Sequence, residues 1–288
     1  MTNEKIDEMT YRIMGRGCDC YLLLGAEEAV MIDSGCDHAN IQEYAQTLTD
    51  LPVNKVINTH SHFDHTGGNG YFKEVYMTKE ASKSAKNFMD EDQNCYRYDY
   101  EVIPITEGPF LLKGRDLMIL YCDIHSPGNI MILDQTHHLL FTGDEIDHDQ
   151  VLLLPGFAEN QNQLHARAAA TVKEYQSMLQ RIWHYEQYFD RLCTGHNGSP
   201  LDKTYIQKMI SCCEEILQGA KGTKDCSSAT YNKNDTHYPM EDANYLRYNS
   251  HRVSLVYCDD DLYDRQNNSR KQPATPLHLM CRENVKNS

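Results

Sequence analysis

Short apolar runs separated by polar residues mark the first two thirds of the chain. The runs at residues 21–24 and 29–32 flank a four-residue turn segment, which predicts a hairpin of two buried strands. Runs of the same kind predict further strands at residues 53–57, 74–77, 102–105, 110–112, 117–121, 129–133, 139–142 and 190–193. The two groups of strands, before and after residue 100, suit two similar sheets stacked on each other.

Apolar residues spaced at i, i+3, i+4 and i+7 occur between and after these strands. This spacing is typical of helices that bury one face, and it predicts helices at residues 39–48, 79–89 and 164–189. A last helix is predicted to begin with Ser199 as its N-cap and Pro200 at its first helical position. Its apolar stripe ends at Gly219, a residue type that commonly follows a helix.

The charge balance of the chain limits its partners. The 288 residues include 27 Lys and Arg against 42 Asp and Glu, which gives a formal net charge of −15. An acidic surface repels phosphate backbones, so nucleic acid and anionic membranes are disfavoured as main partners. We therefore expect a small-molecule substrate.

The cysteines and the apolar runs bear on location. Eleven cysteines are scattered without a CxxC pair, which favours reduced thiols in a reducing compartment. The first ten residues are acidic and lack the apolar run of a signal peptide. No stretch approaches the ~20 apolar residues that a membrane span requires. These features predict a cytoplasmic protein that does not bind membranes.

Most of the candidate metal-binding residues stand in the segment His-Ser-His-Phe-Asp-His, residues 60–65, which closely follows the predicted strand 53–57. Imidazole and carboxylate groups suit zinc, and also iron or manganese. Two histidines two residues apart can point the same way from an extended segment. The adjacent acid and third histidine diverge from that pair, so two metal ions side by side are the simplest account. The four candidate ligands are His60, His62, Asp64 and His65.

Three more candidate ligands stand farther along the chain, each just after an apolar strand. They are His125, Asp144 and His196. Loops at the ends of neighbouring strands meet at one edge of a sheet, so these residues are expected to converge with the histidine-rich segment. Three other histidines are interpreted as surface residues: His137, His138 and His148.

The order of these motifs resembles that of the metallo-β-lactamase-fold hydrolase superfamily. The pattern is HxHxDH, then a histidine before a Pro-Gly turn, then Gly143-Asp144 and Gly195-His196. The resemblance covers residues from about 10 to 220, and the run at residues 59–68 looks most like the glyoxalase-II-like branch. It implies an α/β fold, a four-layer αβ/βα sandwich, with a dinuclear metal site at one edge.

The resemblance also implies a role for each candidate ligand. One ion would be held by His60, His62 and His125, and the second ion by Asp64, His65 and His196. Asp144 would bridge the two ions, and Asp64 would also be catalytic because it can accept a proton or orient the nucleophile. The implied cofactor is two zinc ions per chain, with iron or manganese as alternatives.

The predicted function is that of a dinuclear-metal hydrolase that attacks a small acyl substrate with a metal-bound hydroxide. The expected substrate is a thioester, an ester or a lactone. One alternative is an iron-dependent sulfur dioxygenase on the same fold. Another is a β-lactam or phosphodiester hydrolase, although the acidic charge disfavours a nuclease and the missing signal peptide disfavours a secreted β-lactamase. Substrate-facing candidates lie in the variable segments, at Tyr96, Tyr98, Tyr100 and residues 155–166.

The pattern changes after residue 220. We divide the chain into a catalytic domain, residues 1–220, and a C-terminal extension, residues 221–288. Within the extension, residues 246–248 and 253–257 predict a late strand pair, and residues 264–288 predict a mobile tail. The strand pair can either rejoin the sandwich or form the edge of a homodimer.

Overall fold

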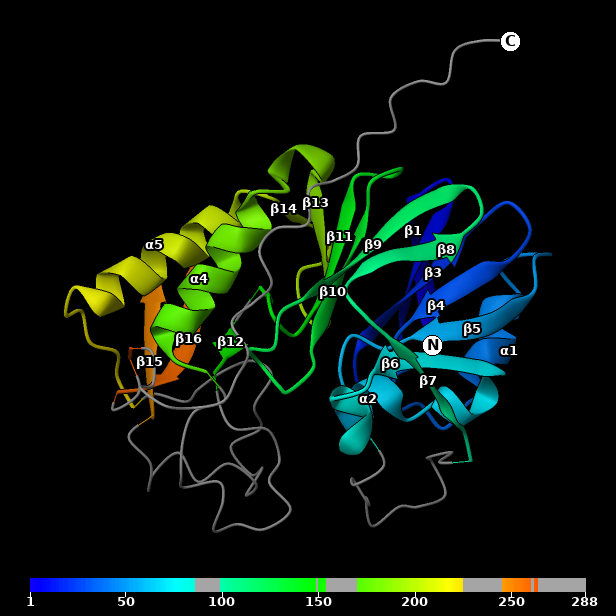
Figure 1. The fold of residues 1–288 in the computed structure, drawn as a ribbon, viewed down its shortest axis with the longest axis horizontal. Coiled ribbons are helices and arrows are strands. Elements are labelled where there is room, and N and C mark those ends of the chain that lie inside the picture. The colour runs from blue at the N-terminus through cyan, green and yellow to red at the C-terminus, as the bar shows by residue number, and fades with distance from the viewer. Residues whose placement is uncertain (86–98, 149, 154–169, 225–244, 260–261, 264–288) are drawn as a thin grey trace.

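A computed structural model describes residues 1–85, 99–148, 150–153, 170–224, 245–259 and 262–263 (Figure 1). Its strands form two large sheets and one small sheet. Several predicted features lie outside the described residues: Tyr96, Tyr98, residues 155–166, the start of the helix predicted from residue 164, and the predicted tail at residues 264–288.

The first sheet contains seven strands in chain order. They are β1 (Thr2–Asp7), β2 (Thr10–Met14), β3 (Asp19–Leu24), β4 (Ala29–Ile32), β5 (Val53–Ile57), β6 (Glu74–Thr78) and β7 (Val102–Ile105). The strands from β1 to β4 pair antiparallel, and those from β4 to β7 pair parallel. Parallel strands end at the same edge, so the segments that follow β4 and β5 emerge side by side.

The second sheet contains six strands in the order β14-β13-β11-β10-β9-β8. Their bounds are β8 (Gly108–Leu112), β9 (Arg115–Tyr121), β10 (Ile130–Asp134), β11 (Leu139–Gly143), β13 (Arg191–Thr194) and β14 (Leu201–Asp202). Strands β11 and β13 are parallel neighbours, with Leu140 opposite Leu192. The residues that follow these two strands, Asp144 and His196 among them, therefore leave the sheet at one edge.

Helix α1 (Ile41–Gln46) covers the outer face of the first sheet, and α4 (Val172–Trp183) and α5 (Tyr205–Leu217) cover the outer face of the second (Figure 1). Helix α2 (Phe63–Thr66) lies in the segment that follows β5, and the short 3-10 turns are η1 (Asn69–Tyr71), η2 (Ala81–Lys83) and η3 (Glu186–Tyr188). One apolar cluster joins α1 to the first sheet, another joins the two sheets, and a third joins the second sheet to α4 and α5. This layering confirms the predicted four-layer αβ/βα sandwich.

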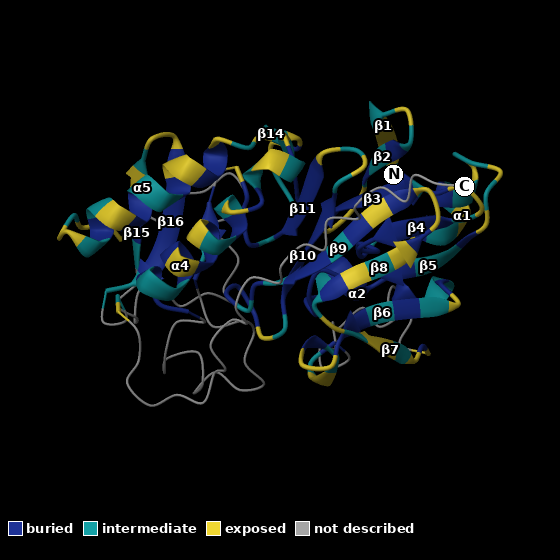
Figure 2. Ribbon diagram, turned by 45° about the horizontal axis from the view of Figure 1, so that its top comes forward, coloured by how far each residue is buried: buried dark blue, intermediate teal, exposed yellow. Residues whose placement is uncertain are grey.

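Strand β10 shows why the strands read as continuous apolar runs. Ile130 and Ile132 belong to the cluster between the sheets, whereas Met131 and Leu133 belong to the cluster under the helices. Successive side chains of a strand point to opposite faces, and here both faces are covered. Figure 2 shows the buried strands in the interior and the exposed residues on the outward faces of α4 and α5.

The third sheet joins the C-terminal extension to the middle of the chain. It contains β12 (Val151–Leu152), β16 (Val253–Cys258) and β15 (Tyr245–Ser250), in that order. The hairpin of β15 and β16 is the late strand pair that the sequence predicts, and β16 runs parallel to β12. The division into domains at residue 220 stays a prediction. None of the helices in the described ranges has both the length and the apolarity of a membrane span.

The predicted start of the last helix is wrong. Helix α5 begins at Tyr205, and Ser199 does not cap it. Leu201 and Asp202 instead form β14, which pairs antiparallel with β13. The pairing with β13 supplies backbone hydrogen bonds to this segment, and it outweighs the local cap signal of a serine followed by a proline.

Two predicted helices and the first two strands also differ from the prediction. The described part of the helix predicted at residues 79–89 is the 3-10 turn η2. In the long helix predicted at residues 164–189, the described helix is α4, which begins after Thr171 in a capping box with Glu174 and ends at Trp183. Strands β1 and β2 were not predicted, because β1 is mostly exposed and its sequence is polar.

Candidate metal centre

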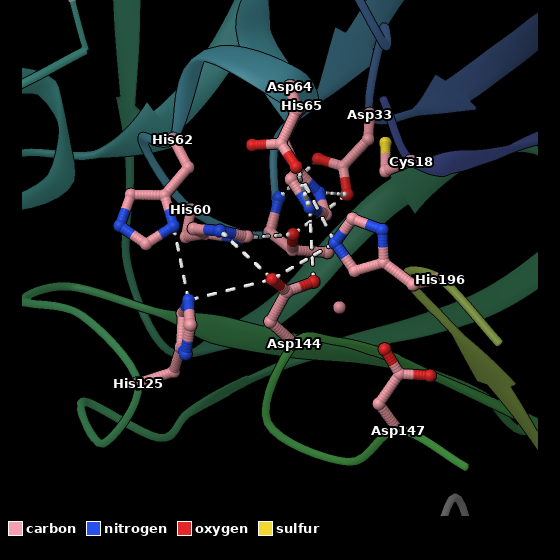
Figure 3. A network of polar contacts seen from close by, with 12 residues as sticks. Cys18, Asp33, His60, His62, Asp64, His65, His125, Asp144, Asp147 and His196 are labelled. Atoms are coloured by element: carbon pink, nitrogen blue, oxygen red, sulfur yellow. Dashed lines mark hydrogen bonds and ion pairs between the residues drawn. The ribbon is translucent and has the colours of Figure 1, made fainter. Parts of the chain in front are cut away.

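The structure brings together all seven residues predicted as metal ligands (Figure 3). They lie at the edge of the sandwich where strands of both large sheets end. His60 to His65 follow β5, His125 follows β9, Asp144 follows β11 and His196 follows β13. In Figure 3 Asp144 lies between His125 and His62 on one side and His196 on the other.

The first group consists of His60, His62, His125 and Asp144, whose possible ligand atoms lie within 4.8 Å of one another. Nε2 of His125 is 3.1 Å from Nδ1 of His62 and 3.5 Å from Oδ2 of Asp144. Nε2 of His60 is 3.9 Å from the same Asp144 oxygen. These four side chains therefore point at one small volume.

The second group consists of Asp64, His65 and His196, again within 4.8 Å of one another. Oδ2 of Asp64 is 3.9 Å from Nε2 of His65 and 3.5 Å from Nε2 of His196. Asp144 also faces this group, since its Oδ1 is 3.0 Å from Nε2 of His65 and its Oδ2 is 3.2 Å from Nε2 of His196. Asp144 is thus the carboxylate shared by both groups.

Several buried atoms in these groups lack hydrogen bonds. Nε2 of His60, Nε2 of His65 and Oδ1 of Asp144 have no hydrogen-bond partner in the described part of the chain. Buried polar atoms are rarely left this way, and cations bound at the two groups would account for all three. Burial lowers the pKa of His62 to about 3 and that of His60 well below its usual value. Both rings are therefore in the neutral form that coordinates metals, and the donor set fits two divalent cations.

Asp33 fixes the histidine-rich segment from behind. It follows β4 and has a positive φ of 57°, and its carboxylate accepts hydrogen bonds from the backbone N–H and the hydroxyl of Thr59, both at 2.8 Å. Its Oδ2 is also 2.8 Å from Nδ1 of His65. A carboxylate that accepts a hydrogen bond from one ring nitrogen of a histidine fixes the orientation of the ring. The other ring nitrogen is then free to coordinate a metal ion.

His125 is held by different elements. Its Nδ1 is 3.2 Å from the backbone carbonyl oxygen of Leu152 in β12. The backbone N–H groups of Ile124 and His125 donate to Oε1 of Glu145 at 3.1 and 3.2 Å. The hydroxyl of Tyr175 in α4 donates to the backbone carbonyl of Glu145 at 2.8 Å. Helix α4 and the third sheet therefore both support this ligand.

The loops that carry Asp144 and His196 are tied to each other. Oδ1 of Asp147 accepts a hydrogen bond of 2.7 Å from the backbone N–H of Asn197. A Cβ atom on Gly195 would lie 2.4 Å from Oδ1 of Asp144, so a side chain there would displace the shared carboxylate. Sequence reasoning missed Asp147 and Glu145, although both stand within three residues of Asp144 and follow a strand that ends at the site.

A buried thiol lies beside the second group. Cys18, Asp33 and His65 also place possible ligand atoms within 4.8 Å of one another. The sulfur atoms of Cys18 and Cys20 lie 3.7 Å apart. Burial raises the pKa of Cys18 well above its usual value, which keeps the thiol protonated and unreactive.

The remaining predicted residues lie away from the ligand groups. Among the substrate-facing candidates only Tyr100 is described, and it is buried. His138 and His148 are exposed, and His137 is half-buried with its Nδ1 3.3 Å from the carboxylate of Asp7. None of these three histidines belongs to a ligand group among the described residues.

The chain is similar to known proteins over most of its length. A model of the metallo-beta-lactamase superfamily matches residues 13–183. The "Beta-lactamase-like protein 2 homolog" of Caenorhabditis elegans is 24% identical over 246 residues, which cover 78% of this chain and 75% of that protein.

Two similar proteins are named as thioesterases. "Acyl-coenzyme A thioesterase MBLAC2" of Gallus gallus is 24% identical over 163 residues, which are 46% of this chain and 58% of that protein. "Atrochrysone carboxyl ACP thioesterase" of Aspergillus fumigatus is 23% identical over 134 residues, which are 46% of this chain and 40% of that protein. The match spans less than two thirds of either thioesterase.

Solved structures share the same architecture. The metallo-beta-lactamase from Pontibacter korlensis superposes with a TM-score of 0.55 and 18% identity, over 74% of this chain and 98% of that one. The metallo-beta-lactamase FIM-1 from Pseudomonas aeruginosa, solved in a mono-zinc form, gives a TM-score of 0.55 and 16% identity over 75% of this chain and 95% of that one. At this level of identity the likeness shows the fold.

Proposed function

Because this chain belongs to the metallo-beta-lactamase superfamily and is a metal-dependent hydrolase, we propose that it hydrolyses acyl thioesters at a dinuclear zinc site. The observation that carries the proposal is the position of Asp144. Its two carboxylate oxygens face His125 on one side and His65 and His196 on the other. A carboxylate shared by two ligand groups is the arrangement that two adjacent cations need.

The seven ligand candidates would hold the two ions as the motif implies. His60, His62 and His125 would hold the first ion, and Asp64, His65 and His196 would hold the second, while Asp144 faces both groups. Divalent cations held there would lower the pKa of a coordinated water towards neutrality and would polarise an acyl carbonyl. Asp64 is the least enclosed carboxylate of the set, with 21% of its side chain exposed, and it is placed to hold a proton at the open side of the site.

The choice of a thioester rests on the relatives. Two of them, from a bird and from a fungus, carry thioesterase names, and their substrates are thioesters of coenzyme A and of a carrier protein. The acidic charge of this chain agrees with a small acyl substrate rather than a nucleic acid. We propose zinc because the histidine and carboxylate donors suit it, and we place the reaction in the cytoplasm as the cysteine content predicts.

A substrate panel tests the proposal. The zinc-loaded protein is assayed with an acyl-coenzyme A, a lactone, a carboxylic ester, a β-lactam and a phosphodiester, and the iron-loaded protein is assayed for oxygen uptake on a persulfide. We expect thioester hydrolysis to be fastest and to fall at least about a hundredfold in Asp64→Ala, since a ligand and proton acceptor is lost. Asp116→Asn, an exposed carboxylate on β9, is the matched control and keeps full activity. Oxygen uptake without thioester cleavage would overturn the proposal.

A further inference from the structure

A cavity of about 390 Å³ lies where the C-terminal hairpin meets the loop that leaves the metal centre. It is lined by His148 and by residues 249–254, which are the end of β15, the hairpin turn and the start of β16. Among the residues that the structure describes, the lining contains histidine, arginine, asparagine and serine side chains and no carboxylate. In a chain with a formal charge of −15, such a lining favours a negatively charged ligand.

The cavity is close to the metal centre along the chain. His148 is four residues from Asp144, a span of at most roughly 14 Å even when fully extended. A Cβ atom on Gly198 would lie 2.6 Å from Cβ of His148, and Gly198 is two residues from His196. Strands β12 and β16 run parallel, so His148 and Val253 both lie at the starting ends of these strands. The cavity therefore opens beside the loops that carry Asp144 and His196.

The hairpin turn has an unusual sequence for its shape. Ser250 pairs with Val253, and the two residues between them, His251 and Arg252, have positive φ angles of 52° and 65°. A two-residue turn with this geometry is normally Asn-Gly, because side chains with a Cβ atom are strained there. This chain has a histidine and an arginine there instead, and backbone strain of this kind clusters at functional sites.

Arg252 differs from the other arginines of the structure. Six of them form hydrogen bonds or ion pairs with acceptors: Arg12, Arg16, Arg115, Arg181, Arg191 and Arg247. Arg252 forms none with any residue that the structure describes. The neighbouring His251 is 2.8 Å from a carboxylate oxygen of Glu215, so Arg252 is the charge that the turn presents to the cavity.

We propose that this cavity binds a phosphate group of the thiol half of the substrate, with Arg252 as its cation. The inference rests on the proposed thioesterase function. The thiols of coenzyme A and of acyl carrier proteins both carry a phosphate at the end of a long, flexible pantetheine arm. That arm lets the thioester carbonyl reach the ligand groups while the phosphate lies in the neighbouring cavity. A guanidinium group suits phosphate because it forms two parallel hydrogen bonds to it.

Binding of substrate fragments without a thioester tests the cavity separately from hydrolysis. Pantetheine 4′-phosphate and adenosine 3′,5′-bisphosphate are titrated calorimetrically into the zinc-loaded full-length protein and into Arg252→Gly. Glycine suits the positive φ, so this variant keeps or raises the thermal unfolding midpoint. We expect its affinity for at least one fragment to fall about tenfold, the usual loss for a charge-assisted hydrogen bond. Arg252→Lys restores part of the affinity.

Lys113→Gln is the matched control, because it removes one exposed cation in the turn between β8 and β9. It should bind both fragments as the wild type does. Arg252-dependent binding of adenosine 3′,5′-bisphosphate identifies coenzyme A as the source of the phosphate, and Arg252-dependent binding of pantetheine 4′-phosphate identifies the arm shared with carrier proteins. Equal binding of both fragments by the wild type and Arg252→Gly overturns the cavity proposal.

Kinetics separate this proposal from the thioesterase proposal. In Arg252→Gly we expect KM for an acyl-coenzyme A to rise about tenfold, while kcat and the hydrolysis of an N-acetylcysteamine thioester, which has no phosphate, stay unchanged. Arg252-dependent binding of the fragments by a protein that hydrolyses no thioester supports the cavity and refutes the proposed function. If Arg252→Gly hydrolyses both the acyl-coenzyme A and the N-acetylcysteamine thioester as the wild type does, the thioesterase function is supported and the cavity proposal is refuted.

Discussion

The metal centre draws its ligands from two regions that the chain builds in different ways. Four come from one six-residue segment after β5, which Asp33 and Thr59 hold by short-range hydrogen bonds. The other three come from the ends of three separate strands and span residues 125–196. The first region is a local structure, and the second exists only when the second sheet, α4 and the third sheet are packed together.

This difference separates two ways of losing a ligand. In the local region, a ligand is displaced by a change in its own hydrogen-bond partner. In the dispersed region, a ligand candidate can be displaced by a change far away in sequence. The backbone carbonyl oxygen of Leu152 in β12 lies 3.2 Å from Nδ1 of His125, and β12 is paired with β16. We therefore expect the two regions to respond differently to substitution, and four variants examine this expectation.

Asp144→Ala should have the largest effect, because Asp144 is the carboxylate that faces both ligand groups. We expect both zinc ions to be lost and kcat/KM for thioester hydrolysis to fall about a thousandfold, the equivalent of several kcal/mol of transition-state stabilisation. Metal analysis and steady-state kinetics measure the two effects. Asp116→Asn is the control, and retention of two zinc ions by Asp144→Ala would refute the assignment of the shared carboxylate.

Asp33→Asn probes the local region alone. Asparagine tolerates the positive φ at this position and keeps the size of the side chain, so the fold should be retained. The substitution removes the carboxylate that orients His65. Loss of such a hydrogen-bond partner of a ligand histidine costs roughly 10- to 100-fold in metal affinity. Competition with a chromophoric chelator should show the weaker binding for one ion, with the other nearly unchanged. Equal weakening of both ions would contradict the inference that Asp33 acts mainly by orienting His65.

Arg247→Met probes the dispersed region from a distance. Nε of Arg247 donates to Ser254 of β16 at 2.9 Å, and its guanidinium also bonds Gln150, the residue before β12. Without these bonds β12 should shift against β16, and the carbonyl that faces His125 should shift with it. We expect the affinity for the ion on the His125 side to fall about tenfold, which is the smallest loss usual when a hydrogen-bond partner of a metal ligand is disturbed. Lys221→Gln, an exposed cation of the same extension, should leave both affinities unchanged.

Thr171→Ala should have the smallest effect and should change stability without changing the metal centre. The hydroxyl of Thr171 accepts from the backbone N–H of Glu174 at 3.0 Å, and this capping box begins α4. Its loss should lower the free energy of unfolding by about 1 kcal/mol. Urea denaturation measures the change. Thr204→Ala is the comparison, because the side chain of Thr204 makes no capping bond to α5. A loss of zinc in Thr171→Ala would show that α4 supports the site more directly than its contacts indicate.

The local region could be read from the sequence almost completely. His60, His62, Asp64 and His65 stand together after an apolar strand, and strands buried on both faces give continuous apolar runs that are easy to place. The three distant ligand candidates could be named because each follows such a strand, and because the order of the motifs resembles that of a known superfamily. These features are local in the chain, so no knowledge of the packing was needed to see them.

The supports of the dispersed region left no comparable signal. The bond from Arg247 to Gln150 joins residues 97 positions apart, and the pairing of β12 with β16 involves only two residues of β12. The cap predicted at Ser199 failed because the Ser199 hydroxyl accepts a hydrogen bond of 2.6 Å from the hydroxyl of Tyr21, 178 positions away, and because the residues after it pair with β13. Contacts of this kind depend on tertiary packing, which propensity and motif spacing do not encode.

Zinc titration of the metal-free protein, followed by the rate of acyl-coenzyme A hydrolysis, tests the central claim most directly. Two adjacent ions sharing Asp144 predict that activity is absent after treatment with a chelator, rises with added zinc and reaches its plateau at about two equivalents per chain. Full thioester hydrolysis by the chelator-treated protein, or a zinc-loaded protein that hydrolyses no thioester, would contradict it.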